Sequence, residues 1–255
     1  MKKELLVALE STRIAVEYLR NNCNAKKIEL KEDGSYVTEN DKVSEQIIIS
    51  KIKEFFPDDL ILSEEKGIIP GKNCKREWII DSLDGTLNFI LGIPFCGVSL
   101  SLVDEKEPLV SVTRSIFSNE YIYRFANHSL ITNTNQCYLH SNRCVIIDNI
   151  SADVNRNSIK RIANICYDSY FPIRSLGSAA IGIMNVILQK ADAYFAPRLR
   201  TWDIAPALHY SKNNDFRLID LDLNPWQPSG NGFGIVRRGS KLEAIIMGVK
   251  DESLY

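Results

Sequence analysis

The stretch WIIDSLDGTLNF, residues 78–89, places two carboxylates, a glycine and a hydroxyl where they could handle a phosphate group. It has the pattern of a buried strand that closes on Asp81 and Asp84 and turns at Gly85. Two aspartates three residues apart can converge on one point at such a turn, and glycine lets backbone amides approach a phosphate closely. Oxygen donors packed in this way favour Mg²⁺. If Thr86 begins a short helix, its amide and hydroxyl add donors for an anion.

The same letters allow two other interpretations. LDGT also occurs in the haloacid-dehalogenase type of phosphatase, which needs an aspartyl nucleophile two residues before Asp84, but this chain has Ser82 there. Asp220 and Asp222 do have the one-residue spacing, but too little chain follows them for the rest of that fold. The other interpretation, a capped turn with solvated aspartates, stays open on this stretch alone.

Composition narrows the classes of partner. The 255 residues include 31 lysines and arginines against 32 acidic residues, so the formal charge is -1 and no broad positive field faces a nucleic acid or a membrane surface. No apolar run approaches the length of about 18 residues that a membrane-spanning helix needs, and charged residues interrupt any signal-peptide core. The six cysteines lack CxxC spacing. We therefore expect a cytoplasmic protein with no nucleic acid and no membrane as partner.

Hydrophobic periodicity predicts the elements that position the carboxylates. Apolar residues recur at three- and four-residue spacing over residues 5–19, which predicts an amphipathic helix of about 18 residues. A second helix follows, capped by Asn40 or Asp41 and ended at Pro57. LILSEE and EWIID read as strands that close on carboxylates, and three further runs joined by short turns predict antiparallel strands: CGVSLSLVD, PLVSVTRSI and EYIYRF.

After about residue 140 the pattern changes to an alternation of strands and helices, in CVIID, SIKRIANIC, FPIRSL, SAAIGIMNVILQ and ADAYFA. We therefore expect an α/β fold with an α+β N-terminal half. Residues 1–140 would form an N-terminal domain with an antiparallel sheet and most metal ligands. Residues 141–255 would form a C-terminal α/β domain that contributes Asp203 and the substrate-lining residues.

A family resemblance is carried by LILSEE, WIIDSLDGTLNF, GSAA and TWDIA, in this order and at these distances. Together they resemble the inositol monophosphatase family of Mg²⁺-dependent, lithium-sensitive phosphatases over roughly residues 5–210. VTENDKVSEQI also resembles the segment with which that family begins its second helix. The resemblance implies a layered αβαβα sandwich of the inositol monophosphatase and fructose-1,6-bisphosphatase type, and a homodimer.

The resemblance also implies metal ligands at positions that match the family's pattern. Glu64 would bind the first ion, and Glu65 would reach a more weakly bound one. Asp81 would bridge metals, and the Leu83 carbonyl would be a further ligand. The set is Glu64, Glu65, Asp81, Leu83, Asp84 and Asp203, the last two holding the second ion. Two or three Mg²⁺ ions are implied, with Mn²⁺ as a substitute and Li⁺ as an inhibitor.

Catalytic and phosphate-binding roles are implied in the same way. Glu64 would hold the attacking water, and Thr86, oriented by Asp41, would help to deprotonate it. Asp84 and the amides of Gly85 and Thr86 would bind the phosphate. This is a two-metal arrangement, in which one ion lowers the pKa of the water and the other stabilises the leaving oxygen.

The substrate-lining candidates are Gly177, Ser178, Ala179, Ala196 and Arg198. For the segment that contains Gly177, Ser178 and Ala179, close helix packing is an equal alternative. The departure from the family's pattern lies at Ala196. Ala196 stands where the inositol phosphatases carry a glutamate that binds ring hydroxyls, and the arginines at 198 and 200 slightly favour a second phosphate. Lys31 matches a lysine near the family's site, but a solvated loop charge is an equal alternative. The histidines His128, His140 and His209 share no metal spacing, and we expect His209 to be structural.

Taken together, the sequence predicts a Mg²⁺-dependent phosphomonoesterase that hydrolyses a small soluble phosphate ester, similar to inositol monophosphate, by attack of a metal-activated water. The alternatives on the same scaffold are a 3'(2'),5'-bisphosphate nucleotidase and a fructose-1,6-bisphosphatase. An alternative of another class is a catalytically weak regulatory protein that binds metal or phosphate.

Overall fold

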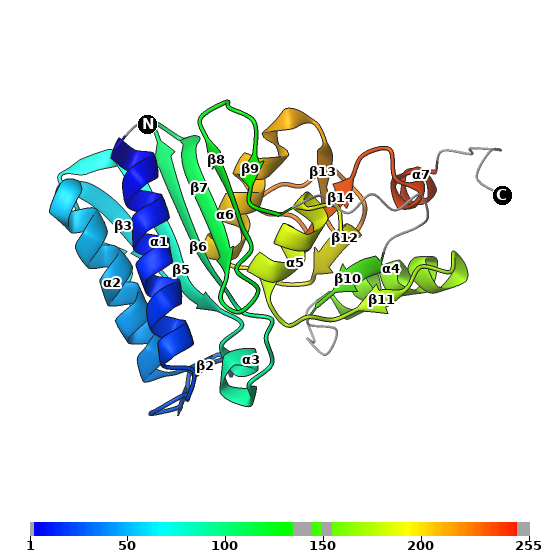
Figure 1. Ribbon diagram of the computed structural model, residues 1–255. Coiled ribbons are helices and arrows are strands. Elements are labelled where there is room, and N and C mark those ends of the chain that lie inside the picture. The colour runs from blue at the N-terminus through cyan, green and yellow to red at the C-terminus, as the bar shows by residue number, and fades with distance from the viewer. Residues whose placement is uncertain (1–2, 135–143, 149–154, 249–255) are drawn as a thin grey trace. The chain divides into compact units, whose positions relative to one another are not determined.

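The computed structural model describes residues 3–134, 144–148 and 155–248 (Figure 1). Its contacts divide the chain into two compact units. The first consists of Met1–Thr134 with Arg200–Tyr210, and the second of Asn135–Leu199 with Ser211–Tyr255. Within the described part of the chain, no helix is long and apolar enough to cross a membrane.

A seven-stranded sheet forms the centre of the first unit, in the order β4-β3-β5-β6-β7-β8-β9. Only the pairing of β3 with β5 is parallel among these neighbours. The five strands predicted from the sequence are confirmed, and β4 and β9 are additions. The strands are β3 (Asp59–Ser63), β4 (Gly67–Ile69), β5 (Asn73–Asp84), β6 (Gly97–Asp104), β7 (Glu107–Ser115), β8 (Tyr121–Phe125) and β9 (Ile131–Thr132). A separate two-stranded hairpin consists of β1 (Glu29–Leu30) and β2 (Tyr36–Val37).

Two long helices cover one face of this sheet, as Figure 1 shows in dark and light blue. They are α1 (Lys3–Asn21) and α2 (Glu39–Phe55), which confirms both predicted helices. The predicted cap of α2, Asn40 or Asp41, was wrong by two or three residues: Thr38 is the N-cap, and Asp41 completes a capping box at the third helical position. Apolar side chains of both helices and of the central strands form one buried core.

The opposite face of the sheet carries α6 (Thr201–Tyr210), which packs on β5, β6 and β7. Side chains alternate along β7, so Val110 and Val112 enter the core below the two long helices while Ser111 and Thr113 face α6. The Thr113 hydroxyl lies 3.0 Å from that of Tyr210. This packing corrects the prediction that Asp203 belongs to a C-terminal domain, because α6 is part of the first unit.

The second unit has its own five-stranded sheet, in the order β11-β10-β12-β14-β13. The described part of the predicted β/α alternation is confirmed: β10 pairs in parallel with β11 and β12, as crossover helices require. The remaining pairs are antiparallel. Its elements are β10 (Cys144–Ile147), α4 (Arg156–Asp168), β11 (Ile173–Arg174), α5 (Ala179–Ile187), β12 (Ala191–Ala196), η1 (Ser211–Asn213), β13 (Phe216–Ile219), β14 (Phe233–Arg237) and α7 (Lys241–Ile246).

Candidate active site

The last residues of β5 form the turn that the sequence indicated. The ladder between β5 and β6 changes register between Asp81 and Asp84, so the backbone bulges where the two carboxylates stand. The amide of Leu83 donates to Asp81 Oδ1 at 3.3 Å, inside this bulge. Gly85 follows with a φ of 86°, a left-handed conformation that glycine adopts without strain. Thr86 then begins α3 (Thr86–Leu91), as predicted.

Asp203 joins these two carboxylates from the first turn of α6. Its Oδ2 accepts the backbone N–H of Arg200 at 2.7 Å, which fixes the side chain at the start of the helix. Carboxylate oxygens of Asp81, Asp84 and Asp203 lie within 4.8 Å of one another. The three aspartates, from a strand end and a helix more than a hundred residues later in the chain, therefore form one cluster within the first unit.

The raised pKa values of two carboxyls in this cluster favour the binding of a cation. Asp81 is 2% exposed, and burial followed by the neighbouring carboxylates raises its pKa well above the usual range. Burial and then the charge of Asp84 raise the pKa of Asp203 to about 8. Two oxygens on opposite sides of a Mg²⁺ ion are about 4 Å apart, because its bonds to oxygen are about 2 Å long. The aspartate cluster fits an ion of this kind with small side-chain movements.

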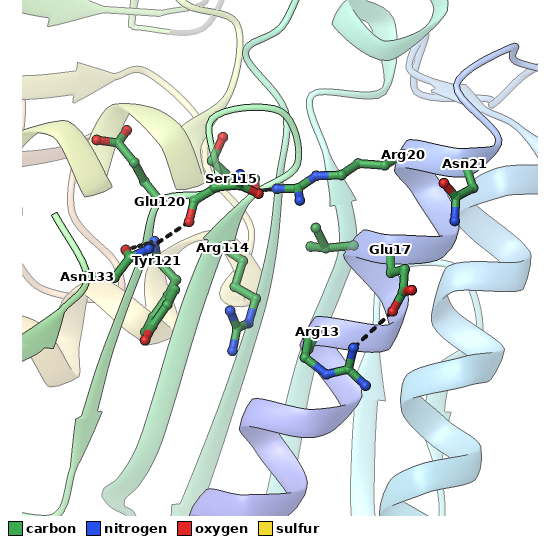
Figure 2. Close-up of a pocket in the computed structure, with 11 residues that line it drawn as sticks. Arg13, Glu17, Arg20, Asn21, Arg114, Ser115, Glu120, Tyr121 and Asn133 are labelled. Carbon is green, nitrogen blue, oxygen red and sulfur yellow. Dashed lines mark hydrogen bonds and ion pairs between the residues drawn. The ribbon is translucent and has the colours of Figure 1, made fainter.

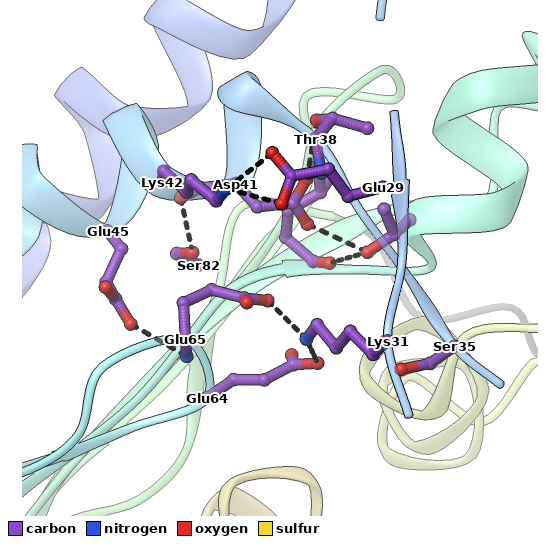
Figure 3. A network of polar contacts seen from close by, with 12 residues as sticks. Glu29, Lys31, Ser35, Thr38, Asp41, Lys42, Glu45, Glu64, Glu65 and Ser82 are labelled. Atoms are coloured by element: carbon purple, nitrogen blue, oxygen red, sulfur yellow. Dashed lines mark hydrogen bonds and ion pairs between the residues drawn. The ribbon is translucent and has the colours of Figure 1, made fainter. Parts of the chain in front are cut away.

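Glu64 and Glu65 lie just after β3 and carry their own counter-charge. Lys31 Nζ donates to Glu64 Oε1 at 2.9 Å and to Glu65 Oε1 at 2.6 Å (Figure 3). Burial raises the pKa of both carboxyls, that of Glu65 to about 7. Burial alone would lower the pKa of Lys31, but its hydrogen bonds to the two glutamates outweigh that and raise it. The alternative of a solvated loop lysine was wrong, since the Lys31 side chain is only 23% exposed.

The backbone amide of Glu65 is itself held in place. It donates to Glu45 Oε1 at 3.0 Å, and Glu45 is a buried residue of α2. Figure 3 shows this contact beside the bonds of Lys31. The turn that presents Glu64 and Glu65 is thus fixed by a buried carboxylate that the sequence analysis did not single out. The only signal for it was a glutamate on the apolar face of a predicted helix.

Thr86 and Asp41 form the pair that the resemblance implied. The Thr86 hydroxyl lies 2.9 Å from Asp41 Oδ1 and 3.1 Å from the Leu83 carbonyl oxygen. A hydroxyl has one proton, so it donates to one of these acceptors at a time and turns a lone pair away from them. Asp41 is 1% exposed and accepts two further bonds from the amide and hydroxyl of Thr38, at 2.8 and 2.5 Å. Burial raises its pKa.

The phosphate-binding role of the Gly85 and Thr86 amides rests on the start of α3. No side chain caps this helix, so its first amides are presented without a side-chain acceptor. A left-handed residue at such a turn is typical of backbone segments whose amides bind anions, and Gly85 has this conformation. The roles of these three residues stay predictions.

The substrate-lining candidates lie in the second unit, so their roles also stay predictions. Gly177 has a φ of 70°, Ser178 caps α5 by accepting from the Ile181 amide, and Ala179 is the first residue of that helix. Ala196 ends β12 and is buried, whereas Arg198 is exposed.

Sequence reasoning missed Asp148, which holds the turn before Ser178. Its Oδ1 accepts from Ser175 Oγ at 3.0 Å and from the amides of Leu176 and Gly177 at 2.7 and 2.9 Å. The signal for it was present, because CVIID is a strand that closes on a carboxylate.

Neither of the two described histidines, His128 and His209, takes part in the carboxylate cluster. His209 is fully buried, with Nδ1 3.1 Å from Ser111 Oγ and Nε2 2.9 Å from the Ala126 carbonyl oxygen. This confirms the structural role of His209, which holds α6 against β7 and the residue that follows β8. His128 is exposed, and His140 lies outside the described residues.

Comparisons with known proteins show the family of this chain. The sequence matches the model of the inositol monophosphatase family over residues 1–209. The Nus factor SuhB of Vibrio cholerae is 30% identical over 219 residues, 80% of each chain. A fructose-1,6-bisphosphatase/inositol-1-monophosphatase of Thermotoga maritima is 32% identical over 176 residues, 68% of this chain and 66% of the relative.

Solved structures show the same fold. An inositol monophosphatase from Thermotoga maritima superposes with a TM-score of 0.81 at 26% identity, covering 97% of both chains. The suhB extragenic suppressor protein of Bartonella henselae superposes with a TM-score of 0.86 at 20% identity, covering 98% of this chain and 100% of the other.

Proposed function

Because the chain belongs to the inositol monophosphatase family, we propose that it is a Mg²⁺-dependent phosphomonoesterase that hydrolyses a small soluble phosphate ester by direct attack of water. The observation that carries the proposal is the convergence of Asp81, Asp84 and Asp203 within 4.8 Å. Such a cluster costs folding free energy unless a cation offsets the mutual repulsion. A metal-dependent activity explains why the chain keeps it.

The residues around the cluster supply the remaining functions. Bound Mg²⁺ would lower the pKa of the attacking water and stabilise the leaving oxygen. Asp81, Asp84 and Asp203, with the Leu83 carbonyl, would hold the ions, and Glu64 would hold the water. Glu65 would contact a weakly bound ion.

Proton transfer and phosphate binding fall to the turn after β5. Thr86 would accept the proton of the water, because the bond from its hydroxyl to Asp41 at 2.9 Å leaves a lone pair free to do so. The amides of Gly85 and Thr86 would donate to the phosphate oxygens, and Asp84 would orient the phosphate through the ion that it holds.

An inositol monophosphate-like ester is the substrate that the family favours. Ala196, fully buried at the end of β12, removes a charged partner for ring hydroxyls, so a bisphosphate is the alternative. Fructose 1,6-bisphosphate follows from the name of the Thermotoga relative, and a 3'(2'),5'-nucleoside bisphosphate from the arginines at 198 and 200. We also infer two or three Mg²⁺ ions, with Mn²⁺ as a substitute and Li⁺ as an inhibitor. A cytoplasmic homodimer completes the proposal.

A second candidate is a regulatory protein that binds metal or phosphate and turns over slowly. The Nus factor names of several relatives support it. The complete set of Glu64, Asp81, Asp84, Thr86 and Asp203 speaks against it, since weak turnover would not require all five.

The test is phosphate release with Mg²⁺ from inositol 1-phosphate, fructose 1,6-bisphosphate, 3'-phosphoadenosine 5'-phosphate and NADP. We expect release from at least one substrate, its loss in EDTA, and its loss in Asp84→Asn prepared identically, which excludes a contaminating phosphatase. Silence across the panel, with folded protein and Mg²⁺ bound, would favour the regulatory candidate.

A further inference from the structure

A pocket rich in arginine lies in the first unit, on the side of the sheet that carries α1 (Figure 2). Its walls come from the second half of α1, the end of β7, the start of β8 and Asn133. The cavity has a volume of about 590 Å³, a size that accommodates a metabolite. None of its lining residues belongs to the candidate active site. The charged side chains in it are Arg13, Glu17, Arg20, Arg114 and Glu120.

Three of these five charged groups are already satisfied. Arg13 is paired with Glu10 at 3.0 Å and with Glu17 at 2.9 Å, a contact drawn in Figure 2. Glu120 accepts hydrogen bonds from the hydroxyls of Ser118 and Thr134 at 3.1 and 3.2 Å. The two remaining groups are the guanidinium ions of Arg20 and Arg114.

Arg20 extends from α1 towards the end of β7, and its bonds are all to backbone. Nε donates to the carbonyl oxygen of Ile116, and Nη2 to that of Ser115 at 3.5 Å. Among the described residues, no carboxylate forms an ion pair with Arg20, and Nη1 makes no hydrogen bond. The backbone contacts hold the guanidinium in place while leaving its charge uncompensated.

Arg114 is fixed from the other side. It donates from Nε to Thr12 Oγ1 at 3.0 Å and from Nη2 to the Leu9 carbonyl oxygen at 3.3 Å, and it stacks on the Tyr121 ring with 4.5 Å to the centroid. In the described part of the chain it too has no carboxylate partner and an unused Nη1. Burial, with the nearby charges of Arg13 and Arg20, lowers the pKa of Arg114 more than the nearby Tyr121 and Glu10 raise it.

We propose that this pocket binds a small molecule that carries a phosphate group, with Arg20 and Arg114 as the anion-binding residues. A phosphate monoester has about two negative charges at neutral pH, which matches two guanidinium ions that form no ion pair within the described residues. Guanidinium N–H groups form short, strong bonds to phosphate oxygens. Both side chains are held by bonds to backbone or hydroxyl groups, so little side-chain entropy is lost when the ligand binds.

The pocket is separate from the carboxylate cluster. Ser115 of β7 pairs with Gly97 of β6, and Gly97 pairs with Asp84 of β5. One strand therefore lies between the two sites, which puts their backbones about 10 Å apart in the sheet. Arg20 belongs to α1, and Arg114 donates hydrogen bonds to α1, so both lie on the face of the sheet that this helix covers. The pocket is therefore a second site and not an extension of the first.

The test uses tripolyphosphate as the probe and isothermal titration calorimetry on the full-length protein in EDTA. Without a divalent cation the carboxylate cluster repels a polyanion, so binding reports the arginine pocket. We expect saturable binding by the wild type, about tenfold weaker in Arg20→Gln and in Arg114→Gln. The matched control is Arg161→Gln, which removes a half-exposed guanidinium of the second unit and should bind like the wild type.

Folding is checked by thermal melting, and Arg114→Lys keeps the charge if the glutamine variant does not fold. This lysine variant should bind within a few-fold of the wild type. Absence of saturable binding at millimolar tripolyphosphate would overturn the proposal. Equal affinity of the wild type and a folded Arg20→Gln would do so as well.

Discussion

Two groups of carboxylates in the first unit are neutralised in different ways. Glu64 and Glu65 share the ammonium group of Lys31, which the loop between β1 and β2 supplies. Asp81 and Asp203 form no ion pair with any lysine or arginine of the described residues. Burial and the neighbouring carboxylates therefore raise the pKa of both carboxyls. The chain thus provides its own cation at the glutamates, and we propose that a divalent cation from solution binds at the aspartates. Each prediction below tests this difference.

The largest effect is expected for Asp84→Asn in the aspartate cluster. Losing a ligand and a phosphate-orienting charge should lower turnover at least about a thousandfold. The thermal midpoint in EDTA should not fall, because the substitution removes a carboxylate whose charge opposes the ionisation of Asp81 and Asp203. Phosphate release and thermal melting measure the two quantities. Asp58→Asn, at a carboxylate 58% exposed, is the matched control and should behave like the wild type. Near-normal rates in Asp84→Asn would refute the site.

The next effect concerns the hydroxyl of Thr86. Thr86→Val keeps the shape of the side chain but loses its bonds to Asp41 and Leu83, so turnover should fall about a hundredfold. Thr86→Ser keeps the hydroxyl and should stay close to the wild type. Turnover at saturating Mg²⁺ distinguishes the two variants. Equal rates in both would show that the hydroxyl has no part in proton transfer.

A smaller effect in the opposite direction is expected at the glutamate pair. Lys31→Met removes a positive charge that competes with an incoming cation, so half-maximal activity should need about two- to fivefold less Mg²⁺. Lys27→Met is the matched control, since Lys27 pairs with Glu39 outside the site and is 73% exposed. A higher Mg²⁺ requirement in Lys31→Met would mean that the lysine assists cation binding.

The smallest effect is on the stability of the metal-free protein. The folded-state pKa of Asp203, about 8, is above its ordinary value of 3.8. Its contribution to stability is therefore complete below the ordinary value and is lost as the pH rises through about 8. Thermal midpoints in EDTA should decline between about pH 5 and pH 9, and less steeply in Asp203→Asn. A steeper decline in that variant would contradict the assignment.

The part of the site that lies close together in the sequence was predictable. Asp81, Asp84, Gly85 and Thr86 share one turn, where backbone geometry fixes their relation over a few residues. Helices and strands followed from periodicity for the same reason, because each buries one face against a core. These local rules needed no knowledge of the tertiary structure.

Contacts between distant segments were not predictable from periodicity and spacing, and the pairing of Asp41 with Thr86 came from the family resemblance alone. Asp203 was assigned to the wrong unit, since only the packing of α6 on β5, β6 and β7 decides that. Lys31 meets Glu64 across 33 positions, and Arg20 meets Ser115 across 95. Composition and local spacing do not predict such pairs, because these contacts depend on which strand lies beside which helix in the folded chain.

The central claim is that Asp81, Asp84 and Asp203 hold a divalent cation. It is tested most directly by anomalous scattering from crystals grown with Mn²⁺ and inorganic phosphate. We expect an anomalous peak within coordination distance of all three carboxylates, and no such peak in crystals of Asp84→Asn. The absence of a peak at these aspartates in crystals saturated with Mn²⁺ would contradict cation binding at this cluster. A peak that persists unchanged in the variant would contradict it as well.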